Sequence, residues 1–176
     1  MKIELKNIEF SERMSEETNC FVADIYVNNK KVGYAKNDGR GGSTCYNAYD
    51  GNNNILKEVE DYCLSLGIIK DEEFNYEYQM TLEHYIDNLL LKWLEKKEEK
   101  KMNKLFENSI VFGIKNSPVY SYISFKSKMK FKDIVKMYGE NTAKIQIQSM
   151  VDSVKTNLKE NEIIFNTNLE QFGIIL

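Results

Sequence analysis

The sequence of 176 residues predicts an α+β fold, in which strands and helices are segregated along the chain. Apolar residues alternate within residues 3–10, 20–28 and 32–34, on either side of a polar loop at residues 11–19, and this is the period of half-buried strands. An apolar stripe at helical spacing occupies residues 82–93. Strands and helices do not alternate regularly, as a doubly wound sheet would require. Residues 1–70 are expected to form a β-meander, a glycine loop and a helix. Residues 71–176 are expected to add a long helix, a hairpin and C-terminal helices, within one compact unit.

Residues 1–36 are expected to form a three-stranded antiparallel meander. The phase of the apolar alternation slips near Lys6 and Asn7, which predicts a β-bulge in the first strand. Residues 20–28 have the clearest period-2 pattern and form the second strand. A tight turn over residues 28–31 should follow, because asparagine tolerates a positive φ. The third strand then continues from this turn.

Two helices are expected in the middle of the chain. The first begins after a run of asparagines at residues 52–54, which offers an N-cap, and ends at Gly67. The second and longest helix is capped by Thr81. Its apolar stripe consists of Leu82, Tyr85, Ile86, Leu89, Leu90 and Trp93.

The end of the long helix leaves two interpretations open. Its apolar stripe stops at KKEEKK, residues 96–101, where pairs of opposite charge at i,i+3 support a solvated helix. Met102, Leu105 and Phe106 then resume the apolar pattern on roughly the opposite face. Either the helix breaks at the charged run, or its far end contacts a different surface. The second interpretation would suit an oligomer or a partner.

The last third of the chain is expected to contain a second hairpin and two more helices. The hairpin consists of residues 110–114 and 119–125. A short helix over residues 131–138 ends at Gly139, and Thr142 caps the helix after it. Residues 162–165 form a candidate last strand. The tail, Phe172 to Leu176, is unusually apolar for a terminus.

The composition limits the classes of partner. With 42% apolar residues the chain can bury a core and is not expected to be disordered. A net charge of −3, without a block of lysine or arginine, argues against general duplex-DNA binding but allows a small anionic ligand in a local pocket. No run of about 18 apolar residues is present, so no membrane span is expected. The charged start MKIELKNIEF is not a signal peptide, and a cytoplasmic location is expected.

Little in the sequence points to catalysis, a metal or a cofactor, and none is expected. The scattered cysteines Cys20, Cys45 and Cys63 are expected to be free thiols. His84 is the only histidine, so structural zinc is not expected. A metal-dependent nuclease would have to use Asp24 and Lys36, although the alternation places Asp24 on the outer face of its strand.

The glycine loop KNDGRGGSTCYNAY, residues 36–49, is the strongest candidate for a ligand site. Its glycines would let backbone amides form an anion-binding nest, and Arg40 offers a planar fork that matches phosphate. The candidate ligand-binding residues are Lys36, Asn37, Gly39, Arg40, Gly41, Gly42, Ser43, Thr44, Tyr46 and Tyr49. The loop is expected to join a strand to a helix, although it has neither the Walker nor the GxGxxG spacing. The alternative is a mobile connector that needs glycine for positive φ.

Three segments carry a resemblance: MKIELKNIEF, SEETNCFVADIYVNNKKVGYAKNDGRGG and the helix that follows. They resemble small proteins of phages and mobile elements with an MKIELKN-like start and an N-x-G-x-G-G loop. The resemblance covers roughly the first 65 residues and carries no settled activity. It implies a phage-borne protein in the host cytoplasm with a counter-defence role. Asn37, Gly39, Gly41 and Gly42 are the loop positions that match.

The leading hypothesis is a non-catalytic protein of phage type that sequesters a phosphate-bearing nucleotide, such as a host anti-phage immune signal. Arg40 would pair with phosphate, the amides of Gly41 and Gly42 would cradle it, and Tyr46 or Tyr49 would stack on the base. The long helix or a second protomer would enclose the ligand.

Two other hypotheses stay open. The first is a protein–protein inhibitor of a host defence nuclease complex such as CRISPR-Cas. Met102, Leu105, Phe106 and the apolar tail would then contact that partner, or a second copy in a homo-oligomer. The second is a metal-dependent enzyme that acts on nucleotides or nucleic acid.

Overall fold

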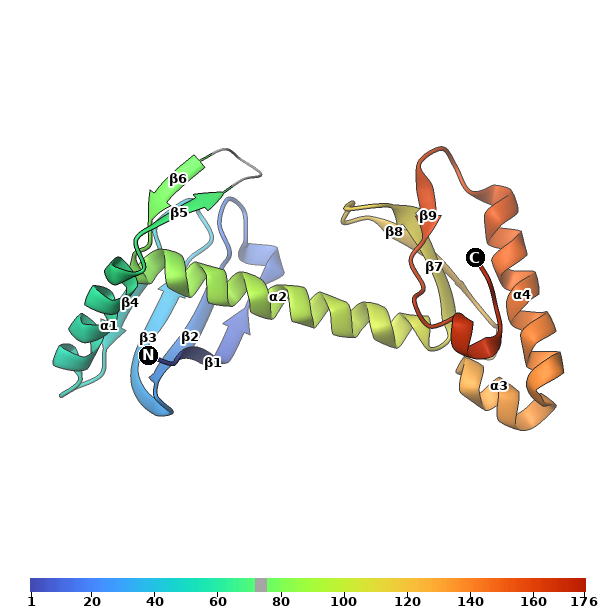
Figure 1. Cartoon of the computed structure of the whole chain (residues 1–176), viewed down its shortest axis with the longest axis horizontal. Helices are drawn as coiled ribbons and strands as arrows, with labels where there is room; N and C mark the ends of the chain where they lie inside the picture. The colour runs from blue at the N-terminus through green and yellow to red at the C-terminus, as the bar shows by residue number, and fades with distance from the viewer. Residues whose placement is uncertain (72–75) are drawn as a thin grey trace. The chain divides into compact units, whose positions relative to one another are not determined.

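The computed structural model describes residues 1–71 and 76–176 (Figure 1). It confirms the predicted α+β class, with an antiparallel N-terminal sheet, a long central helix, a second hairpin and C-terminal helices. No helix in these two stretches is long and apolar enough to cross a membrane.

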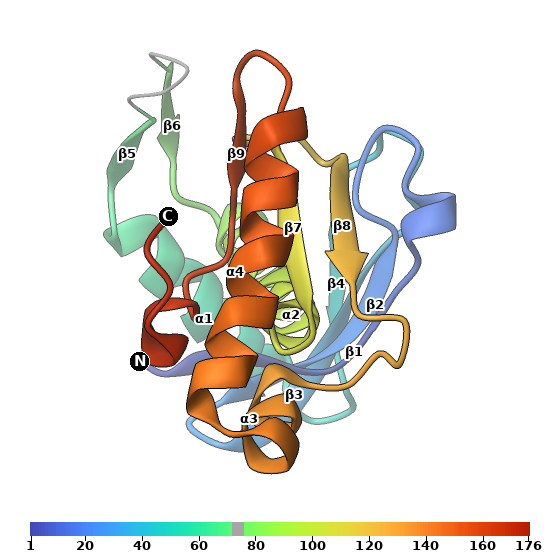
Figure 2. The same cartoon turned by 90° about the vertical axis from the view of Figure 1, so that its right-hand side faces the viewer.

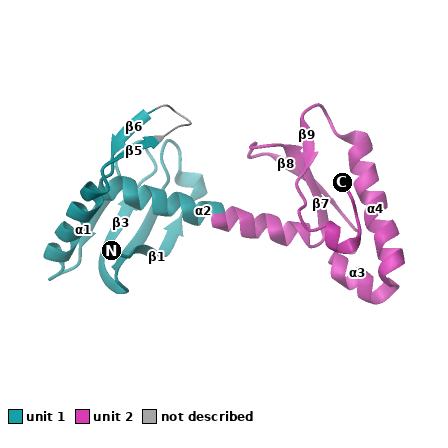
Figure 3. Cartoon of the chain, in the orientation of Figure 1, with its two compact units in different colours: residues 1–95 teal, residues 96–176 magenta. Residues whose placement is uncertain are grey.

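The chain divides into two compact units, residues 1–95 and residues 96–176 (Figure 3). We refer to them as unit 1 and unit 2. The division lies inside the long helix α2 (Leu82–Phe106), so each unit contains part of this helix. The boundary drawn from the sequence, after residue 70, falls inside a short strand instead. This strand, β5 (Ile68–Asp71), pairs with β6 (Tyr76–Gln79) in a hairpin that the sequence pattern did not indicate.

Unit 1 is built on a four-stranded antiparallel sheet in the order β1-β2-β3-β4. Its strands are β1 (Ile3–Phe10), β2 (Phe21–Val27), β3 (Lys30–Asn37) and β4 (Cys45–Ala48). The register of β1 against β2 shifts between Lys6 and Glu9, and Asn7 has a φ of 51°, which confirms the predicted bulge. Asn28 and Asn29 both have positive φ, which confirms the predicted turn. The strand β4 extends the predicted meander from three strands to four.

Two helices cover one face of this sheet. They are α1 (Asn53–Ser65) and the first half of α2. The core between them and the sheet includes Phe21, Ala23, Ile25, Val32, Leu56, Val59, Cys63, Leu82, Ile86 and Leu90. The chain leaves α1 through Gly67, whose φ of 79° is the left-handed conformation expected after a helix end.

The helix α2 runs without interruption through the charged run at residues 96–101. Its start is capped as predicted, because the backbone N–H of His84 donates to Oγ1 of Thr81 at 3.2 Å. Of the two interpretations for its far end, the break is wrong. Phe106 is buried inside unit 2, where its carbonyl oxygen accepts a hydrogen bond from Nδ2 of Asn168 at 2.8 Å. Phe106 therefore packs within its own chain, and its side chain is not exposed for a partner.

Unit 2 contains a three-stranded antiparallel sheet in the order β8-β7-β9. Its elements are β7 (Ser109–Ile114), β8 (Tyr120–Ser124), α3 (Phe131–Tyr138), α4 (Glu140–Asn157), β9 (Glu162–Ile164) and a 3-10 turn, η2 (Glu170–Phe172). In Figure 2, α4 runs in front of β7 and β9. The predicted cap at Thr142 is wrong: α4 begins at Glu140, directly after Gly139, whose φ of 79° ends α3.

A buried asparagine ties the C-terminal segment to β7. Oδ1 of Asn166 accepts the backbone N–H of Val111 at 2.7 Å, and its Nδ2 donates to the carbonyl oxygen of Ser109 at 2.9 Å. Asn166 is only 4% exposed, so these bonds replace those that water would make. The tail beyond it is partly buried: Ile174 belongs to the core of unit 2, whereas Ile175 and Leu176 are exposed.

Candidate functional site

The glycine loop joins two strands of the same sheet. Residues 38–44 connect β3 to β4, whose pairing places Lys36 opposite Cys45 and Gly33 opposite Ala48. The expected strand-to-helix context is therefore wrong, because β4 lies between the loop and α1. No helix N-terminus follows the glycines directly, so the dipole of α1 does not complete a phosphate nest at this position.

Hydrogen bonds within unit 1 fix the loop. Oδ1 of Asn37 accepts from the N–H of Gly39 at 2.9 Å and from the hydroxyl of Thr18 at 2.8 Å. Nδ2 of Asn37 donates to the carbonyl oxygen of Gly42 at 2.8 Å. The N–H of Gly41, which was expected to hold phosphate, donates to Oγ1 of Thr18 at 3.3 Å. Asn37 and Thr18, from outside the loop, thus hold the conformation of the loop.

The backbone conformation explains why glycine is needed at two of the three clustered positions. Gly39 and Gly41 both have a φ of 84°, which disfavours any residue with a Cβ atom. A Cβ at Gly39 would collide with the carbonyl oxygen of Met14, and one at Gly41 would collide with the carboxylate of Glu17. Gly42 has ordinary φ and no atom within 4 Å of its Cβ position. Positive φ therefore accounts for Gly39 and Gly41, as the connector alternative assumed.

Thr44 connects the loop to the long helix. It is 4% exposed, its N–H donates to Oε1 of Glu83 at 3.0 Å, and its hydroxyl donates to Oδ1 of Asp87 at 2.6 Å. Burial raises the pKa of Asp87, the hydrogen bond from Thr44 opposes that rise, and the nearby charge of Glu83 adds to it. The net effect is a pKa for Asp87 above its ordinary value.

This raised pKa predicts the sign of a pH effect. A carboxyl group with a higher pKa in the folded state contributes stability below its unfolded pKa, and that contribution is lost as the pH rises through the folded pKa. Asp87→Asn keeps an acceptor for Thr44 and removes the charge. It is therefore expected to raise the urea midpoint at about pH 7 and to have little effect at about pH 3.5. The exposed Asp50→Asn is the control, and a lower midpoint for Asp87→Asn at about pH 7 would contradict the sign.

The loop borders a hollow of about 430 Å³ whose lining is acidic. Its lining residues are Glu17, Thr18, Asn19, Asn37, Gly41, Gly42, Ser43, Thr44, Glu83, Asp87 and Leu91. Among residues 1–71 and 76–176, three carboxylic residues and no lysine or arginine line this hollow. Arg40 and Lys36 are exposed but are not part of the lining. A phosphate in this hollow would be repelled by its like-charged walls.

The two tyrosines expected to stack on a base lie elsewhere. Tyr46 packs against the core of unit 1, where burial and a hydrogen bond with Glu60 raise its pKa to about 12. The hydroxyl of Tyr49 donates to Oδ1 of Asp24 at 2.8 Å. Neither tyrosine lines the hollow. Of the ten candidate residues, the structure brings Asn37, Gly41, Gly42, Ser43 and Thr44 to the hollow.

Asp24 is engaged in a network on the outer face of the sheet. It accepts hydrogen bonds from Nδ2 of Asn7 at 2.8 Å and from Tyr49, and it pairs with Nζ of Lys31 at 2.9 Å. Burial raises the pKa of Asp24, but the hydrogen bonds from these three groups outweigh it and leave the pKa below its ordinary value. Lys31, and not Lys36, is its ionic partner. Within residues 1–71 and 76–176, no group of three or more His, Cys, Asp or Glu side chains is placed to hold a metal ion.

The two units have formal charges of opposite sign, although the net charge of the whole chain is only −3. Residues 1–95 contain ten basic and eighteen acidic residues, a formal charge of −8. Residues 96–176 contain fourteen lysines and nine acidic residues, a formal charge of +5. An anionic ligand is therefore attracted to unit 2 and repelled by unit 1.

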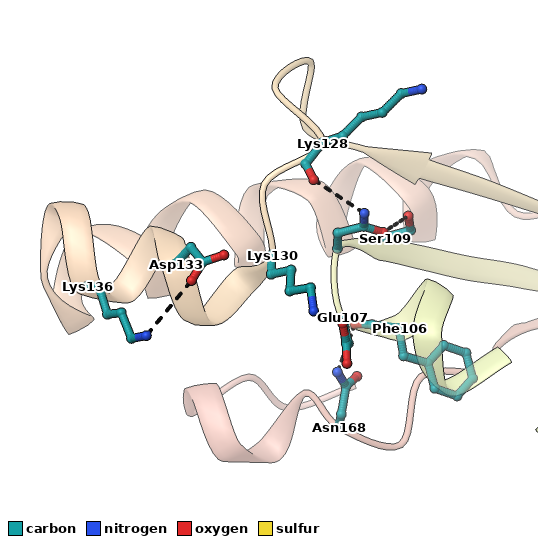
Figure 4. Close-up of polar contacts among 9 residues, drawn as sticks. Phe106, Glu107, Ser109, Lys128, Lys130, Asp133, Lys136 and Asn168 are labelled. Carbon is teal, nitrogen blue, oxygen red and sulfur yellow. Dashed lines mark hydrogen bonds and ion pairs between the residues drawn. The ribbon is translucent and has the colours of Figure 1, made fainter. Parts of the chain in front are cut away.

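Unit 2 has a hollow of about 560 Å³, which we call the lysine hollow. It lies where α3, the start of α4 and η2 meet. Its lining residues are Lys132, Val135, Lys136, Glu140, Asn141, Lys144, Gln171, Phe172 and Gly173. Three lysines and one glutamate thus line it, the reverse of the balance in unit 1, and Nζ of Lys136 also lies 4.0 Å from Oδ1 of Asp133 (Figure 4). The first turn of α4 also lines it, and the positive end of a helix dipole favours an anion.

The lysine hollow has a fixed apolar wall. The ring of Phe172 packs edge-on against the buried Phe131, with ring centroids 5.7 Å apart. Beside it, the side chain of Lys144 lies over Gly173: a Cβ there would be 3.3 Å from Nζ of Lys144. An aromatic wall among lysines and side-chain amides provides contacts for both the base and the phosphate of a nucleotide.

A second hollow, of about 350 Å³, adjoins the first. The two share Lys132, Gln171 and Phe172. At this second hollow Oε2 of Glu107 pairs with Nζ of Lys130 at 2.6 Å, and Figure 4 shows Asn168 beside them. The hydrogen bond and charge of Lys130 lower the pKa of Glu107, and Lys132 adds to this effect. Glu107 is thus an exposed carboxylate with lysines beside it.

The lysines of unit 2 were not among the residues singled out from the sequence. A signal for them is present: Lys126, Lys128, Lys130 and Lys132 occupy every second position, and Lys136 follows. A charge summed over the whole chain conceals this pattern, because unit 1 contributes a large acidic excess.

Comparisons with protein-family models, with curated proteins and with solved structures found no match for this chain. The class of function is therefore inferred from the chemistry of two of the hollows. These are the acidic hollow beside the glycine loop and the lysine hollow of unit 2.

Proposed function

We propose that this protein is a non-catalytic binding protein that holds a phosphate-bearing nucleotide in the lysine hollow of unit 2. The observation that carries the proposal is the convergence of Lys132, Lys136 and Lys144 on one hollow of about 560 Å³. That volume lies within the range of small-molecule sites, roughly 300–1,000 Å³. Lysine is a common partner of phosphate, to which it presents a compact point charge.

The proposal keeps the ligand class expected from the sequence and changes its location. In the glycine loop of unit 1, the N–H groups of Gly39 and Gly41 already donate to side chains of the protein. The hollow that the loop borders is lined by carboxylates. In unit 2, Asn141 and Gln171 add amide groups beside the lysines, and Phe172 offers a surface for a base. The charge of +5 on this unit would steer an anionic ligand toward it.

The biological role that we propose is sequestration. The resemblance of the first part of the chain to small phage proteins suggests a counter-defence setting, in which a bound nucleotide signal is withheld from its receptor. Sequestration requires binding without turnover. No candidate nucleophile or metal cluster is needed for it.

A protein–protein inhibitor stays the second candidate, because the hollow of unit 1 favours a different partner. Glu17, Glu83 and Asp87 line it next to Leu91, whose side chain is 47% exposed. Carboxylates beside an exposed apolar side chain would suit a basic and partly apolar segment of a host nuclease complex. This candidate predicts a protein partner in a pulldown and no nucleotide ligand.

Calorimetric titration with a panel of cyclic, linear and ADP-ribose-type nucleotides tests the first proposal. At least one member is expected to bind, and Lys136→Gln/Lys144→Gln is expected to weaken that binding about tenfold or more through the loss of two charge-assisted contacts. Lys155→Gln/Lys159→Gln, which removes two exposed lysines outside the hollow, is the matched control.

Arg40→Ala separates the two locations. It should bind like the unmodified chain if the ligand occupies unit 2, and it should lose binding if the ligand occupies the glycine loop. Absence of binding across the whole panel would overturn the proposal of a nucleotide ligand.

A further inference from the structure

The strand β8 lies at an edge of its sheet and lacks the features that usually protect such an edge. Among residues 1–71 and 76–176, only β7 pairs with β8, and in Figure 2 β8 lies on the side of β7 away from β9. Its five residues, Tyr120–Ser124, include no charged side chain and no proline, and its register against β7 has no bulge. The backbone groups on its outer side are therefore available to another strand.

The other edges of the two larger sheets differ from β8. The edge strand β1 carries Glu4, Lys6 and Glu9 and contains the bulge near Asn7, and both features discourage pairing with another chain. The edge strands β4 and β9 are short, with four and three residues. The edge of β8 is thus better suited to pairing than these three.

The side chains of β8 divide between the two faces of the sheet. Ile123 is in register with Ile110 and packs against the core of unit 2. Tyr122 is in register with Val111, so it lies on the opposite face, and it is 55% exposed. Val119, just before the strand, is 74% exposed. Partial burial of these two exposed side chains would favour the addition of a strand at this edge.

We infer that β8 pairs antiparallel with β8 of a second copy of this chain, which joins two three-stranded sheets into one of six strands. A two-fold axis at Tyr122, the middle residue, allows all five residues of the strand to pair. The opposed pairs would then be Tyr122 with Tyr122, Tyr120 with Ser124, Ser121 with Ile123 and, just outside the strand, Val119 with Phe125.

Charge and symmetry favour a second copy as the partner. Residues 118–125 are all uncharged, so the antiparallel pairing places no like charges opposite each other. A two-fold axis is the commonest symmetry of homo-oligomers, and it uses the same strand on both copies. The joined sheet would end at β9 on both sides, so the pairing would cover the long edge without exposing another. Because Tyr122 does not line the lysine hollow, this inference does not rest on the proposed function.

Sedimentation velocity of the full chain tests the inference. A dimer is expected to form as the protein concentration rises from about 1 to about 200 μM. Each copy contributes a unit with a formal charge of +5, so the dimer should be tighter in about 0.5 M salt than in about 0.05 M salt. An anionic ligand in the lysine hollow should show the opposite dependence on salt.

Tyr122→Lys should disrupt the dimer, because it places two ammonium groups opposite each other at the axis. The dissociation constant is expected to rise at least about tenfold. Tyr138→Lys is the matched control, because Tyr138 is exposed to a similar extent, 52%, and lies outside β8 in the same unit. The control should dimerise like the unmodified chain. Nucleotide binding by Tyr122→Lys should be unchanged, so the proposed function is measured separately.

Disulfide cross-linking tests the register of the pairing. Cys20→Ser/Cys45→Ser removes the two thiols that are not buried. In this background Tyr122→Cys should give a covalent dimer on mild oxidation, because directly opposed residues have Cβ atoms about 4.5–5.5 Å apart, close to disulfide geometry. Tyr138→Cys in the same background should remain monomeric on non-reducing electrophoresis.

Each outcome decides the inference. Loss of the dimer in Tyr122→Lys together with cross-linking of Tyr122→Cys would support it. A chain that stays monomeric at all concentrations, or a dimer that persists in Tyr122→Lys, would overturn it and leave the proposed function unaffected. A dimer that weakens as salt rises would indicate a charged interface and would also overturn it. Absence of cross-linking in Tyr122→Cys would exclude the axis at this residue.

Discussion

Replacing Gly39 with alanine is expected to destabilise unit 1 by about 2–5 kcal/mol. Two costs combine at this position. Alanine disfavours the φ of 84°, and its Cβ would collide with the backbone carbonyl of Met14 and lie 2.9 Å from Cβ of Cys20. The carbonyl oxygen of Gly39 also accepts N–H groups from three successive residues, Glu16, Glu17 and Thr18, so a shift of the loop would weaken several hydrogen bonds together.

Gly42→Ala is the matched control for this prediction. Gly42 lies three positions away, has no positive φ, and has open space at its Cβ position. Its replacement is expected to be neutral or to stabilise by up to about 1 kcal/mol, because alanine restricts the unfolded chain. Urea titration followed by tryptophan fluorescence measures both variants, since Trp93 is the only tryptophan and packs against the core of unit 1. Equal midpoints for the two alanine variants would contradict the geometry of the loop.

Asn166→Ala is expected to destabilise unit 2 by about 2–4 kcal/mol. The substitution leaves the N–H of Val111 and the carbonyl oxygen of Ser109 without the partner that now satisfies both. Val111 and Ser109 are themselves almost fully buried, so water cannot readily take the place of the amide group. The loss should resemble that of two buried hydrogen bonds.

Asn157→Ala, at an exposed position near the end of α4, is the control and should cost less than about 1 kcal/mol. Circular dichroism follows both units, whereas tryptophan fluorescence follows unit 1. A lower midpoint by circular dichroism alone would assign the loss to unit 2. An unchanged midpoint for Asn166→Ala in both signals would show that the asparagine does not stabilise the sheet.

Local patterns predicted most of the fold. The alternation in β1, β2 and β3, the bulge near Asn7 and the stripe of α2 all follow from side chains that meet one face of their own element. The short strand β4 escaped prediction because only Tyr46 and Ala48 turn toward the core, too few to establish a period. Its pairing with β3 is a long-range effect that a local pattern does not contain.

The chemistry of the glycine loop was harder to predict than its conformation. Sequence neighbours such as Arg40 and Tyr49 were expected to be parts of one site, yet neither lines the hollow. The residues that decide the charge of that hollow, Glu83 and Asp87, come from α2 about forty positions later. Spatial neighbours from distant elements, and not the loop itself, thus give this hollow most of its acidic lining.

The division of the two units inside α2 bears on how such a chain is inherited. Exchange of domains between genes is best tolerated at exposed linkers, where few contacts cross the boundary. A fragment that ended at Glu95 would leave the last four carbonyl groups of a helix without partners, and one that began at Lys96 would leave the first four N–H groups in the same condition. Recombination at this point would therefore require a new helix cap in each of the two products.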